Sequence, residues 1–295
     1  MKTFEYRKVS TLEEAFRLFQ EHGEGAKVLA GGTDLFVKMR NRSFQPEILI
    51  DLKGLPGLDR IVYDPPGGLR LGALVSIHDL ETSPLVGEKF GLLSQGAASL
   101  GSYQIRCRAT LGGNICNASP AADMVPGLVA LGAGVKIVGP GGERVLPLEE
   151  VFAGPGKTRL QAGEILTEVR VPPPSDPTGF HYSKHGIRKA MDLAVVGVAV
   201  VLTADSSKER CRRGKIALGA VGPVPMRAGR AEDFLRGRKL DEEVISGAAR
   251  LAAEEAQPVT DVRASAEYRR EMVRVLTARA IRQAWQRIQT GERGR

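Results

Sequence analysis

A run of prolines divides this chain of 295 residues into two parts. Four prolines fall within residues 171–179, the segment VPPPSDPTG. Proline fixes φ and lacks an amide hydrogen, so neither a helix nor the interior of a sheet continues through such a run. A chain of this length also exceeds what one small core usually organises. We therefore predict a first domain over residues 1–175, a second over residues 176–295, and a linker at residues 171–179.

The first domain is predicted to have two lobes, because its residue pattern changes near residue 58. Before that point, Thr11 and Glu14 form a capping box ahead of an apolar helical stripe, and the strand-like runs AKVLA and EILIDL flank a short helix. This order predicts a small parallel sheet over residues 1–57. Residues 58–175 contain short strands, tight turns such as PPGG and two helices. We expect a larger antiparallel α+β lobe there.

The second domain begins with strands and ends with helices. The runs DLAVVGVAVVLTA and GKIALGAVG are typical of buried strands. The last long segment, SAEYRREMVRVLTARAIRQAWQRI, repeats apolar residues at spacings of three and four and places arginines elsewhere. It predicts a docked helix with a solvated basic face. The predicted fold class is therefore α+β, a two-lobed domain followed by a C-terminal α+β domain.

Composition and charge favour a soluble cytoplasmic protein. Hydrophobic residues make up 42% of the chain and charged residues 26%, which is ordinary for a globular protein. No apolar run approaches the roughly 20 residues that span a bilayer, and the charged N-terminus has no signal-peptide core. The net charge of +8 is spread thinly, so we expect no nucleic-acid partner. An acidic partner subunit or an anionic substrate stays open.

The cysteines and histidines do not predict a metal site. Cys107, Cys116 and Cys211 are three in number, at spacings that match neither a zinc site nor an iron–sulfur run. His181 and His185 lie in a segment that reads as strand or loop, where the geometry of one helical turn is not available. Any iron–sulfur centre is therefore expected in another chain.

Two glycine-containing segments give the strongest functional signal. One is VLAGGTDL at residues 28–35, and the other is TLGGN at residues 110–114. Unblocked backbone amides in a concave loop or at a helix N-terminus bind a pyrophosphate without a lysine. Neither segment has the pattern of a P-loop or of a Rossmann dinucleotide site. Either segment alone would more often be a turn, but the pair favours a pyrophosphate-binding site made of two glycine loops.

Asp123 follows the second glycine segment. Ser119 and Pro120 have the pattern of an N-cap followed by a first-turn proline, which would put Asp123 inside the first two turns of a helix. From there its carboxylate could accept hydrogen bonds from ribose or ribityl hydroxyls.

These motifs together resemble the FAD-binding subunit, or FAD domain, of molybdenum hydroxylases, including the medium subunit of aerobic carbon monoxide dehydrogenase and the flavin region of xanthine dehydrogenase. The resemblance extends over nearly the whole chain. VLAGGTDL and TLGGNICNASPAADMVP resemble the two flavin loops, and GEILTEVRVP resembles the strand that ends the flavin domain. IALGAVGPVPMRAGRAEDFL and SAEYRREMVRVLTARAI resemble the C-terminal domain.

The resemblance implies FAD as cofactor and a set of contacts with it. The two glycine segments would hold the pyrophosphate, and Asp123 would hold a cofactor hydroxyl. Leu100 and Leu166 fall where the family packs apolar groups on the flavin or adenine, and Lys184 where it places a lysine near the flavin. Tyr182 could cover one face of the isoalloxazine or be an ordinary aromatic at a strand end. The predicted cofactor-binding residues are Val28, Leu29, Ala30, Gly31, Gly32, Thr33, Asp34, Leu35, Leu100, Thr110, Gly112, Gly113, Asn114, Asp123, Leu166, Tyr182 and Lys184.

The resemblance also implies an electron-transfer function without a catalytic acid or base in this chain. A molybdopterin-containing large subunit and a [2Fe–2S] small subunit would be separate chains, and FAD would pass electrons to an external acceptor. One alternative is a self-sufficient FAD-dependent reductase on a similar fold, like the reductase of peptidoglycan precursor synthesis, which needs its own acid and base residues. Another is an interaction subunit that has lost the cofactor.

Overall fold

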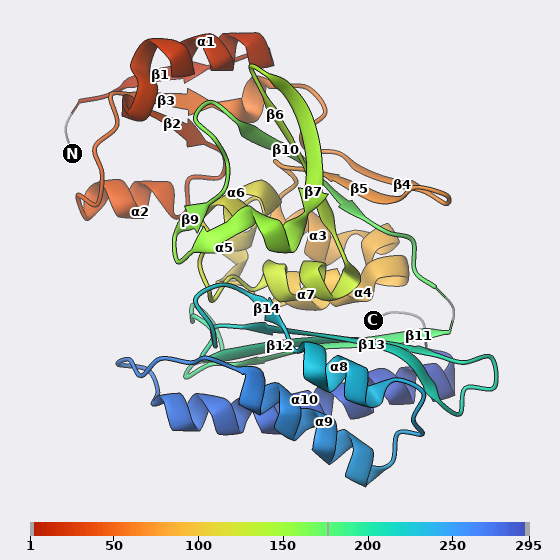
Figure 1. The fold of residues 1–295 in the computed structure, drawn as a ribbon. Coiled ribbons are helices and arrows are strands. Elements are labelled where there is room, and N and C mark those ends of the chain that lie inside the picture. Colours follow the sequence, from red (N-terminus) through yellow and green to blue (C-terminus); the bar gives the residue numbers. More distant parts are fainter. Residues whose placement is uncertain (1–2, 176, 293–295) are drawn as a thin grey trace.

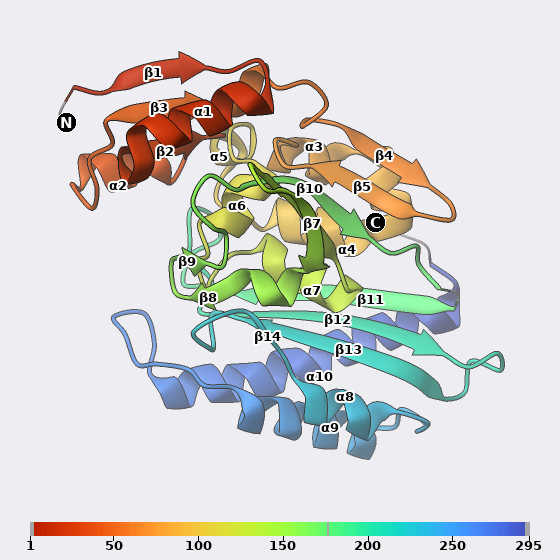
Figure 2. The same cartoon turned by 45° about the horizontal axis from the view of Figure 1, so that its top comes forward.

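The computed structural model describes residues 3–175 and 177–292 and has the predicted α+β class. Figure 1 shows an N-terminal lobe, a middle lobe and a C-terminal domain stacked along the long dimension of the molecule. Turning the molecule, as in Figure 2, separates the small sheet of the N-terminal lobe from the larger sheet of the middle lobe.

The N-terminal lobe contains a parallel three-stranded sheet. Its strands β1 (Glu5–Lys8), β2 (Ala26–Leu29) and β3 (Ile48–Asp51) have the order β1-β3-β2. Helix α1 (Leu12–His22) begins where the Thr11 hydroxyl accepts a hydrogen bond from the Glu14 amide. Helix α2 (Leu35–Arg40) follows β2 directly after the first glycine segment. The strand, loop, helix and strand order predicted from the sequence is confirmed.

The middle lobe contains an antiparallel five-stranded sheet with the order β4-β5-β10-β6-β7. The strands are β4 (Ile61–Asp64), β5 (Gly68–Gly72), β6 (Gly134–Gly139), β7 (Gly142–Pro147) and β10 (Ile165–Val171), with a small ladder of β8 (Phe152–Gly154) and β9 (Lys157–Thr158). The helices are α3 (Ile77–Thr82), α4 (Pro84–Ala98), α5 (Tyr103–Arg106), α6 (Leu111–Cys116) and α7 (Met124–Leu131). Their apolar side chains share one buried core with the sheet.

The C-terminal domain is a four-stranded antiparallel sheet covered by helices. Its strands β11 (Thr178–His185), β12 (Val196–Ala204), β13 (Cys211–Gly219) and β14 (Met226–Arg227) pair in chain order. Helices α8 (Gly229–Leu235), α9 (Glu242–Glu255) and α10 (Ala266–Thr290) cover one face, and α7 of the middle lobe lies against the other (Figure 1). At Gly179 a Cβ would lie 2.0 Å from the Ala284 carbonyl oxygen, so this glycine allows α10 to cross β11 closely.

Three local predictions are corrected by the structure. Residues 110–114 do not form an open loop, because Thr110 is the N-cap of α6 and the glycines lie inside that helix. Helix α7 does not begin at Pro120 but at Met124, so Asp123 occupies its N-cap position. Strand residues reach into both ends of the predicted linker, since β10 ends at Val171 and β11 begins at Thr178.

Other predictions of organisation have different outcomes. The histidines of β11 lie on a strand, as predicted. The lobe and domain limits at residues 57/58 and 175/176 stay predictions. Within residues 3–175 and 177–292, no helix is long and apolar enough to cross a membrane.

Candidate cofactor site

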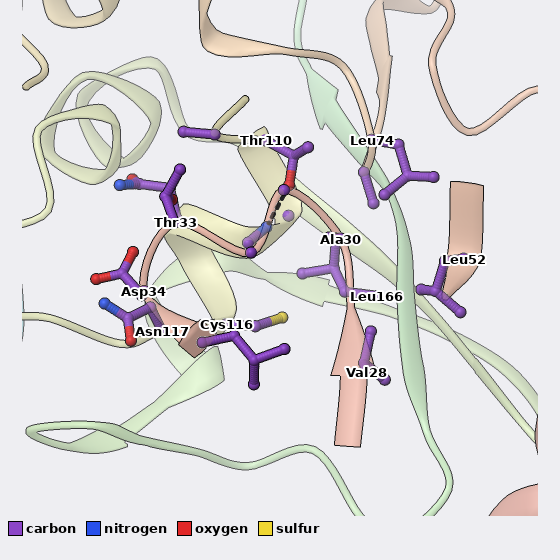
Figure 3. A pocket seen from close by; sticks show the side chains of 18 of the residues that line it. Val28, Ala30, Thr33, Asp34, Leu52, Leu74, Thr110, Cys116, Asn117 and Leu166 are labelled. Atoms are coloured by element: carbon purple, nitrogen blue, oxygen red, sulfur yellow. Dashed lines mark hydrogen bonds between the residues drawn. The ribbon is translucent and has the colours of Figure 1, made fainter. Parts of the chain in front are cut away.

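A cavity of ≈ 340 Å³ lies where the N-terminal lobe meets the middle lobe. Its walls come from the loop between β2 and α2, the segment from Leu100 to Asn117, and β10 (Figure 3). The volume lies within the range of about 300–1,000 Å³ that is usual for cofactor pockets. The boundary between the two lobes is therefore the candidate site.

The first glycine segment reaches the second across this boundary. A Cβ on Gly31 would lie 2.0 Å from the Arg108 carbonyl oxygen, so the backbone of the first segment touches the chain two residues before the second segment. Gly32 has φ +80°, a left-handed conformation that favours glycine. These two residues let the loop turn tightly while it stays against the middle lobe. The convergence of the two segments is thus built into the fold.

The backbone amides of the first segment are free to bind a ligand. For the N–H groups of residues 31–35, no hydrogen-bond acceptor is found in the described part of the chain. The Thr33 hydroxyl also has no partner there, and residues 30–35 all line the cavity. Adjacent free amides in a curved loop form a nest with partial positive charge, which suits a phosphate oxygen. The first segment therefore has the donors that the sequence predicts.

The amides of residues 111–114 in the second segment are not free, which corrects the prediction that both segments offer unblocked N–H groups. The Leu111 and Gly112 amides donate to the Val75 and Ala73 carbonyls at 3.0 and 2.8 Å. The Gly113 amide donates to the Thr110 hydroxyl at 3.2 Å, and the Asn114 amide to the Thr110 carbonyl at 2.9 Å. The second segment can therefore contribute side chains to a ligand. The N–H groups of residues 111–114, however, already donate hydrogen bonds within the protein.

Asn114 provides a direct test of whether a polar ligand fits here. Its side-chain Oδ1 is buried and has no hydrogen-bond partner in the described part of the chain, although the residue lines the cavity. A buried polar atom without a partner costs roughly 1–3 kcal/mol, so such atoms are rare unless a ligand satisfies them. The unpartnered amide beside the nest indicates that the site is built for a polar group.

The cavity has one polar and one apolar side. In Figure 3, Thr33, Asp34 and Asn117 lie on one side, and Val28, Leu52, Leu74 and Leu166 lie on the other. Apolar walls with a few placed polar groups are typical of sites for large ring-containing cofactors. The residues present thus fit a molecule such as FAD, which joins aromatic rings through a diphosphate.

Most of the predicted site residues lie in this cavity, and several others were missed. The predicted residues that line it are Val28, Ala30, Gly31, Gly32, Thr33, Asp34, Leu35, Leu100, Thr110, Gly112, Gly113, Asn114 and Leu166. The lining residues absent from the prediction are Lys27, Lys38, Phe44, Leu52, Ala73, Leu74, Ile105, Ala109, Cys116, Asn117, Leu160, Glu164 and Ile165. Most of the latter are ordinary strand, helix or loop residues, and no local sequence pattern marks them.

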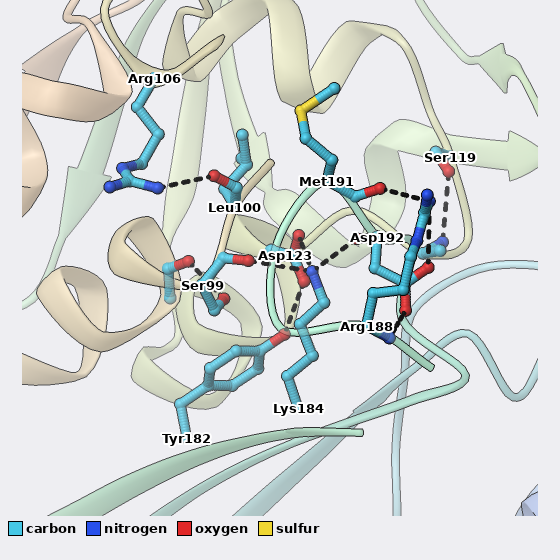
Figure 4. A network of polar contacts seen from close by, with 12 residues as sticks. Ser99, Leu100, Arg106, Ser119, Asp123, Tyr182, Lys184, Arg188, Met191 and Asp192 are labelled. Carbon is cyan, nitrogen blue, oxygen red and sulfur yellow. Dashed lines mark hydrogen bonds and ion pairs between the residues drawn. The ribbon is translucent and has the colours of Figure 1, made fainter. Parts of the chain in front are cut away.

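Four predicted residues lie outside the cavity lining. Leu29 is buried with Met39 and Leu49 in a small core cluster. Asp123, Tyr182 and Lys184 form a separate network at the contact between α7 and β11 (Figure 4). Direct contact of these four residues with a cofactor stays a prediction.

The network around Asp123 is buried and fully hydrogen-bonded. Its carboxylate accepts a hydrogen bond from Lys184 Nζ at 2.9 Å and another from the Tyr182 hydroxyl at 3.2 Å. Lys184 Nζ also donates to the carbonyl oxygens of Ser99 and Asp192 at 3.0 and 2.9 Å. Burial raises the pKa of Asp123 to about 6, although Lys184 and Tyr182 lower it, and burial raises the pKa of Tyr182 well above 10. Since Leu100 lines the cavity and Ser99 belongs to this network, the two sites are neighbours.

Comparison with protein families covers nearly the entire chain. Residues 2–174 match the family described as the FAD binding domain in molybdopterin dehydrogenase. Residues 180–284 match the CO dehydrogenase flavoprotein C-terminal domain. The chain belongs to the FAD-binding subunits of the molybdenum hydroxylase family. FAD is accordingly its cofactor.

Named relatives of this FAD-binding subunit family have the same length and fold. The carbon monoxide dehydrogenase medium chain of Hydrogenophaga pseudoflava is 34% identical over 284 residues, which cover 96% of this chain and 98% of the relative. The 6-hydroxypseudooxynicotine dehydrogenase complex subunit alpha of Paenarthrobacter nicotinovorans is 32% identical and covers 97% and 95%. The solved carbon monoxide dehydrogenase from Hydrogenophaga pseudoflava superposes with a TM-score of 0.93 at 34% identity, covering 97% of this chain and 98% of that chain. These relatives are subunits of dehydrogenases, so this chain is an oxidoreductase subunit.

Proposed function

We propose that this chain is the electron-transfer subunit of a molybdenum hydroxylase complex. In this proposal electrons come from [2Fe–2S] centres of a partner subunit and leave through FAD to an external acceptor. Bound FAD supplies the ability to accept electrons singly and to pass on a pair. The observation that carries the proposal is the row of free amides at residues 31–35 beside the unpartnered Asn114 side chain.

The proposed roles follow from the groups that each residue presents. The amides of residues 31–35 and the Thr33 hydroxyl bind the diphosphate, and the Asn114 side chain orients a polar group of the cofactor. Leu100 and Leu166 pack on its rings. The network of Asp123, Tyr182 and Lys184 supports the neighbouring wall of the cavity through Ser99, and we propose that Lys184 adjusts the charge near the flavin. These roles are binding and positioning, so no residue acts as a general acid or base.

The need for partner subunits is supported by the relatives. The names of these relatives describe parts of larger enzymes, such as a dehydrogenase complex subunit and a nicotine 6-hydroxylase medium subunit. The match of residues 180–284 to a CO dehydrogenase flavoprotein domain also favours such a subunit over a self-sufficient reductase. We propose a molybdopterin-containing subunit and a [2Fe–2S] subunit as partners, in the cytoplasm.

We predict that the purified chain binds one FAD, and that Asn114→Ala weakens this binding at least tenfold. The variant removes an amide that the protein itself leaves without a partner, so its cofactor-free form should be as stable as the wild type. Flavin absorbance with fluorescence titration gives the stoichiometry and Kd, and thermal unfolding of the cofactor-free forms gives stability. Gln104→Ala, which removes an exposed amide outside the cavity, is the matched control. Unchanged FAD affinity in Asn114→Ala, or a colourless wild-type chain that takes up no FAD, would contradict the proposed site.

A further inference from the structure

Large exposed apolar side chains gather on one side of the molecule. Among the described residues, twelve large hydrophobic side chains are exposed, and seven of them come from three segments: α5, the loop between β11 and β12, and the stretch from the end of α9 to the start of α10. We call these seven the apolar face: Tyr103, Ile187, Met191, Leu193, Val259, Val262 and Tyr268. Figure 1 shows the two loops projecting on the same side of the C-terminal domain.

Hydrogen bonds hold these three segments together. The Met191 amide donates to the Gly101 carbonyl at 2.9 Å, which ties the β11–β12 loop to the start of the α5 segment. The Tyr268 hydroxyl lies 3.0 Å from His185 Nε2, at the end of β11. Arg269 connects the Val195 carbonyl to the Asp261 carboxylate at 2.7 Å each. The three segments that carry the apolar face are therefore held next to one another.

Exposure of this surface is unusual for a free protein. Val262 is fully exposed at 102%, and Val259 and Ile187 are exposed at 70% and 64%. Single exposed apolar residues are common, but a cluster of several generally marks an interaction surface. The other five exposed residues, Tyr6, Phe36, Val37, Val62 and Val145, lie on α2 and on strands of the first two sheets.

The charges around the apolar face indicate which kind of partner fits. Arg108, Lys189 and Arg270 belong to the same three segments and have no ion-pair partner within residues 3–175 and 177–292. Glu267 is the acidic residue of these segments that is likewise unpaired in the described structure. A second copy of this chain would bring like charges together, in agreement with the overall charge of +8. Exposed apolar side chains with unpaired cations on or next to the same segments instead fit a partner surface that combines apolar and acidic side chains.

Part of the apolar face belongs to a segment that lines the cofactor cavity. Leu100 and Ile105 point into the cavity, whereas Tyr103 between them is exposed on the face. Lys184 Nζ joins the same wall to the β11–β12 loop through the carbonyls of Ser99 and Asp192 (Figure 4). A partner on this face would lie beside the cofactor.

We propose that the apolar face is the docking surface for another subunit of the complex, one whose contact surface combines apolar and acidic side chains. This inference rests on the proposed function, which requires such a complex. In this proposal Ile187, Leu193 and Val259 supply apolar contacts, and Arg108, Lys189 and Arg270 supply positive charge.

The test uses the complex copurified through a tag on this chain, with its subunits identified by mass. Leu193→Glu and Val259→Glu should each weaken association of an identified subunit at least tenfold, with one FAD still bound. Val62→Glu and Val145→Glu, at exposed valines on β4 and β7, are the matched controls and should assemble normally. Raising the salt concentration should weaken assembly, and Lys189→Glu should reduce this salt dependence.

A native thiol gives an independent readout. Cys107 is exposed beside Arg108 at the end of α5, so maleimide should label it in the isolated flavin-bound chain and label it at least tenfold more slowly in the complex. Normal assembly of the Leu193 and Val259 variants with unprotected Cys107 would overturn the docking surface and leave the proposed function standing. The variants could instead assemble normally but lose self-association or binding to phosphatidylserine vesicles. That result would assign the apolar face to another role and also overturn the proposed docking surface. A wild-type chain that binds FAD but copurifies with no iron–sulfur or molybdopterin subunit would instead contradict the proposed function.

Discussion

Asp123 and Lys184 come from different domains and form a buried ion pair. The ammonium group lies 2.9 Å from the carboxylate, and both side chains are nearly inaccessible to solvent. Burial nevertheless dominates and raises the carboxyl pKa from 3.8 to about 6. A carboxyl group with a raised pKa binds its proton more readily in the folded than in the unfolded chain. It therefore adds stability as the pH falls from above 6 toward 4, and this contribution is lost as the pH rises.

We predict that the stability difference between wild type and Asp123→Asn changes with pH. At pH 4 the Asp123 carboxyl of the wild type is protonated and neutral, like the amide of the variant, so the two proteins should differ little in stability. As the pH rises from 4 to 7 the wild type should lose about 2 kcal/mol relative to the variant, because the buried carboxyl ionises at a higher pH in the folded chain than in the unfolded chain. Urea unfolding of both proteins across this range measures the difference. If the wild type instead gains stability relative to the variant as the pH rises, the ion pair rather than burial controls the pKa.

At the scale of residues, the amides of the first glycine segment are free, as the sequence predicts, whereas those of residues 111–114 in the second are not. Both segments contain two adjacent glycines and a threonine, yet the partners of their amides depend on residues far away in the chain. Ala73 and Val75 accept hydrogen bonds from the Gly112 and Leu111 amides, and no local pattern predicts this pairing. The unpartnered Asn114 oxygen likewise becomes visible only when its surroundings are known.

At the scale of elements, Arg269 holds the start of α10 in place. It is 2% exposed, and its guanidinium donates to the carbonyls of Val195 and Ala220 and to the Asp261 carboxylate. Burial raises the pKa of Asp261, but hydrogen bonds from the Arg263 and Ala264 amides and from Arg269 outweigh this and hold the pKa well below its usual range. This arginine therefore connects α10, the loop before it and the last residues before β12.

We predict that Arg269→Met destabilises the chain by about 3 kcal/mol, because it takes the donor from two buried carbonyls and removes one ion pair of the Asp261 carboxylate. Thermal or urea unfolding measures this loss. Arg270→Met, at the adjacent exposed arginine, should change stability by less than about 0.5 kcal/mol and is the matched control. Equal effects of the two substitutions would show that the buried contacts of Arg269 contribute nothing specific.

Most elements could be predicted because their apolar periodicity is local. The strands β2 and β3 and the helices α2 and α10 follow from such patterns. The start of α7 could not, because Ser119 and Pro120 have a good N-terminal pattern but the Pro120 carbonyl accepts a hydrogen bond from the Ala220 amide at 2.7 Å. Because the Pro120 carbonyl is used in this contact with the second domain, α7 begins at Met124.

At the scale of the whole molecule, the two domains contact each other next to the cofactor cavity. Helix α7 contacts β12 and β13, and the network of Asp123, Tyr182 and Lys184 crosses the same boundary. The C-terminal domain therefore supports the wall of a cavity formed by the two lobes of the first domain. The succession of a parallel sheet, an antiparallel sheet and a C-terminal α+β domain was predictable from the pattern of strands and helices, whereas this support depends on contacts between residues about sixty positions apart.

The family matches over residues 2–174 and 180–284 are both to flavoprotein domains. We therefore predict that the isolated FAD-bound chain does not hydroxylate a substrate, and that turnover appears only when the partner subunits are added. Substrate-dependent reduction of a dye acceptor measures turnover for the chain alone, for the partners alone and for the reconstituted complex. In a complex assembled with cofactor-depleted Asn114→Ala, substrate should still bleach the iron–sulfur absorbance of the partner, but electron delivery to the acceptor should fall at least tenfold. That result would show that hydroxylation takes place in a partner subunit and that electrons leave through this chain. Turnover by the isolated FAD-bound chain would instead place hydroxylation in this chain and contradict the proposal.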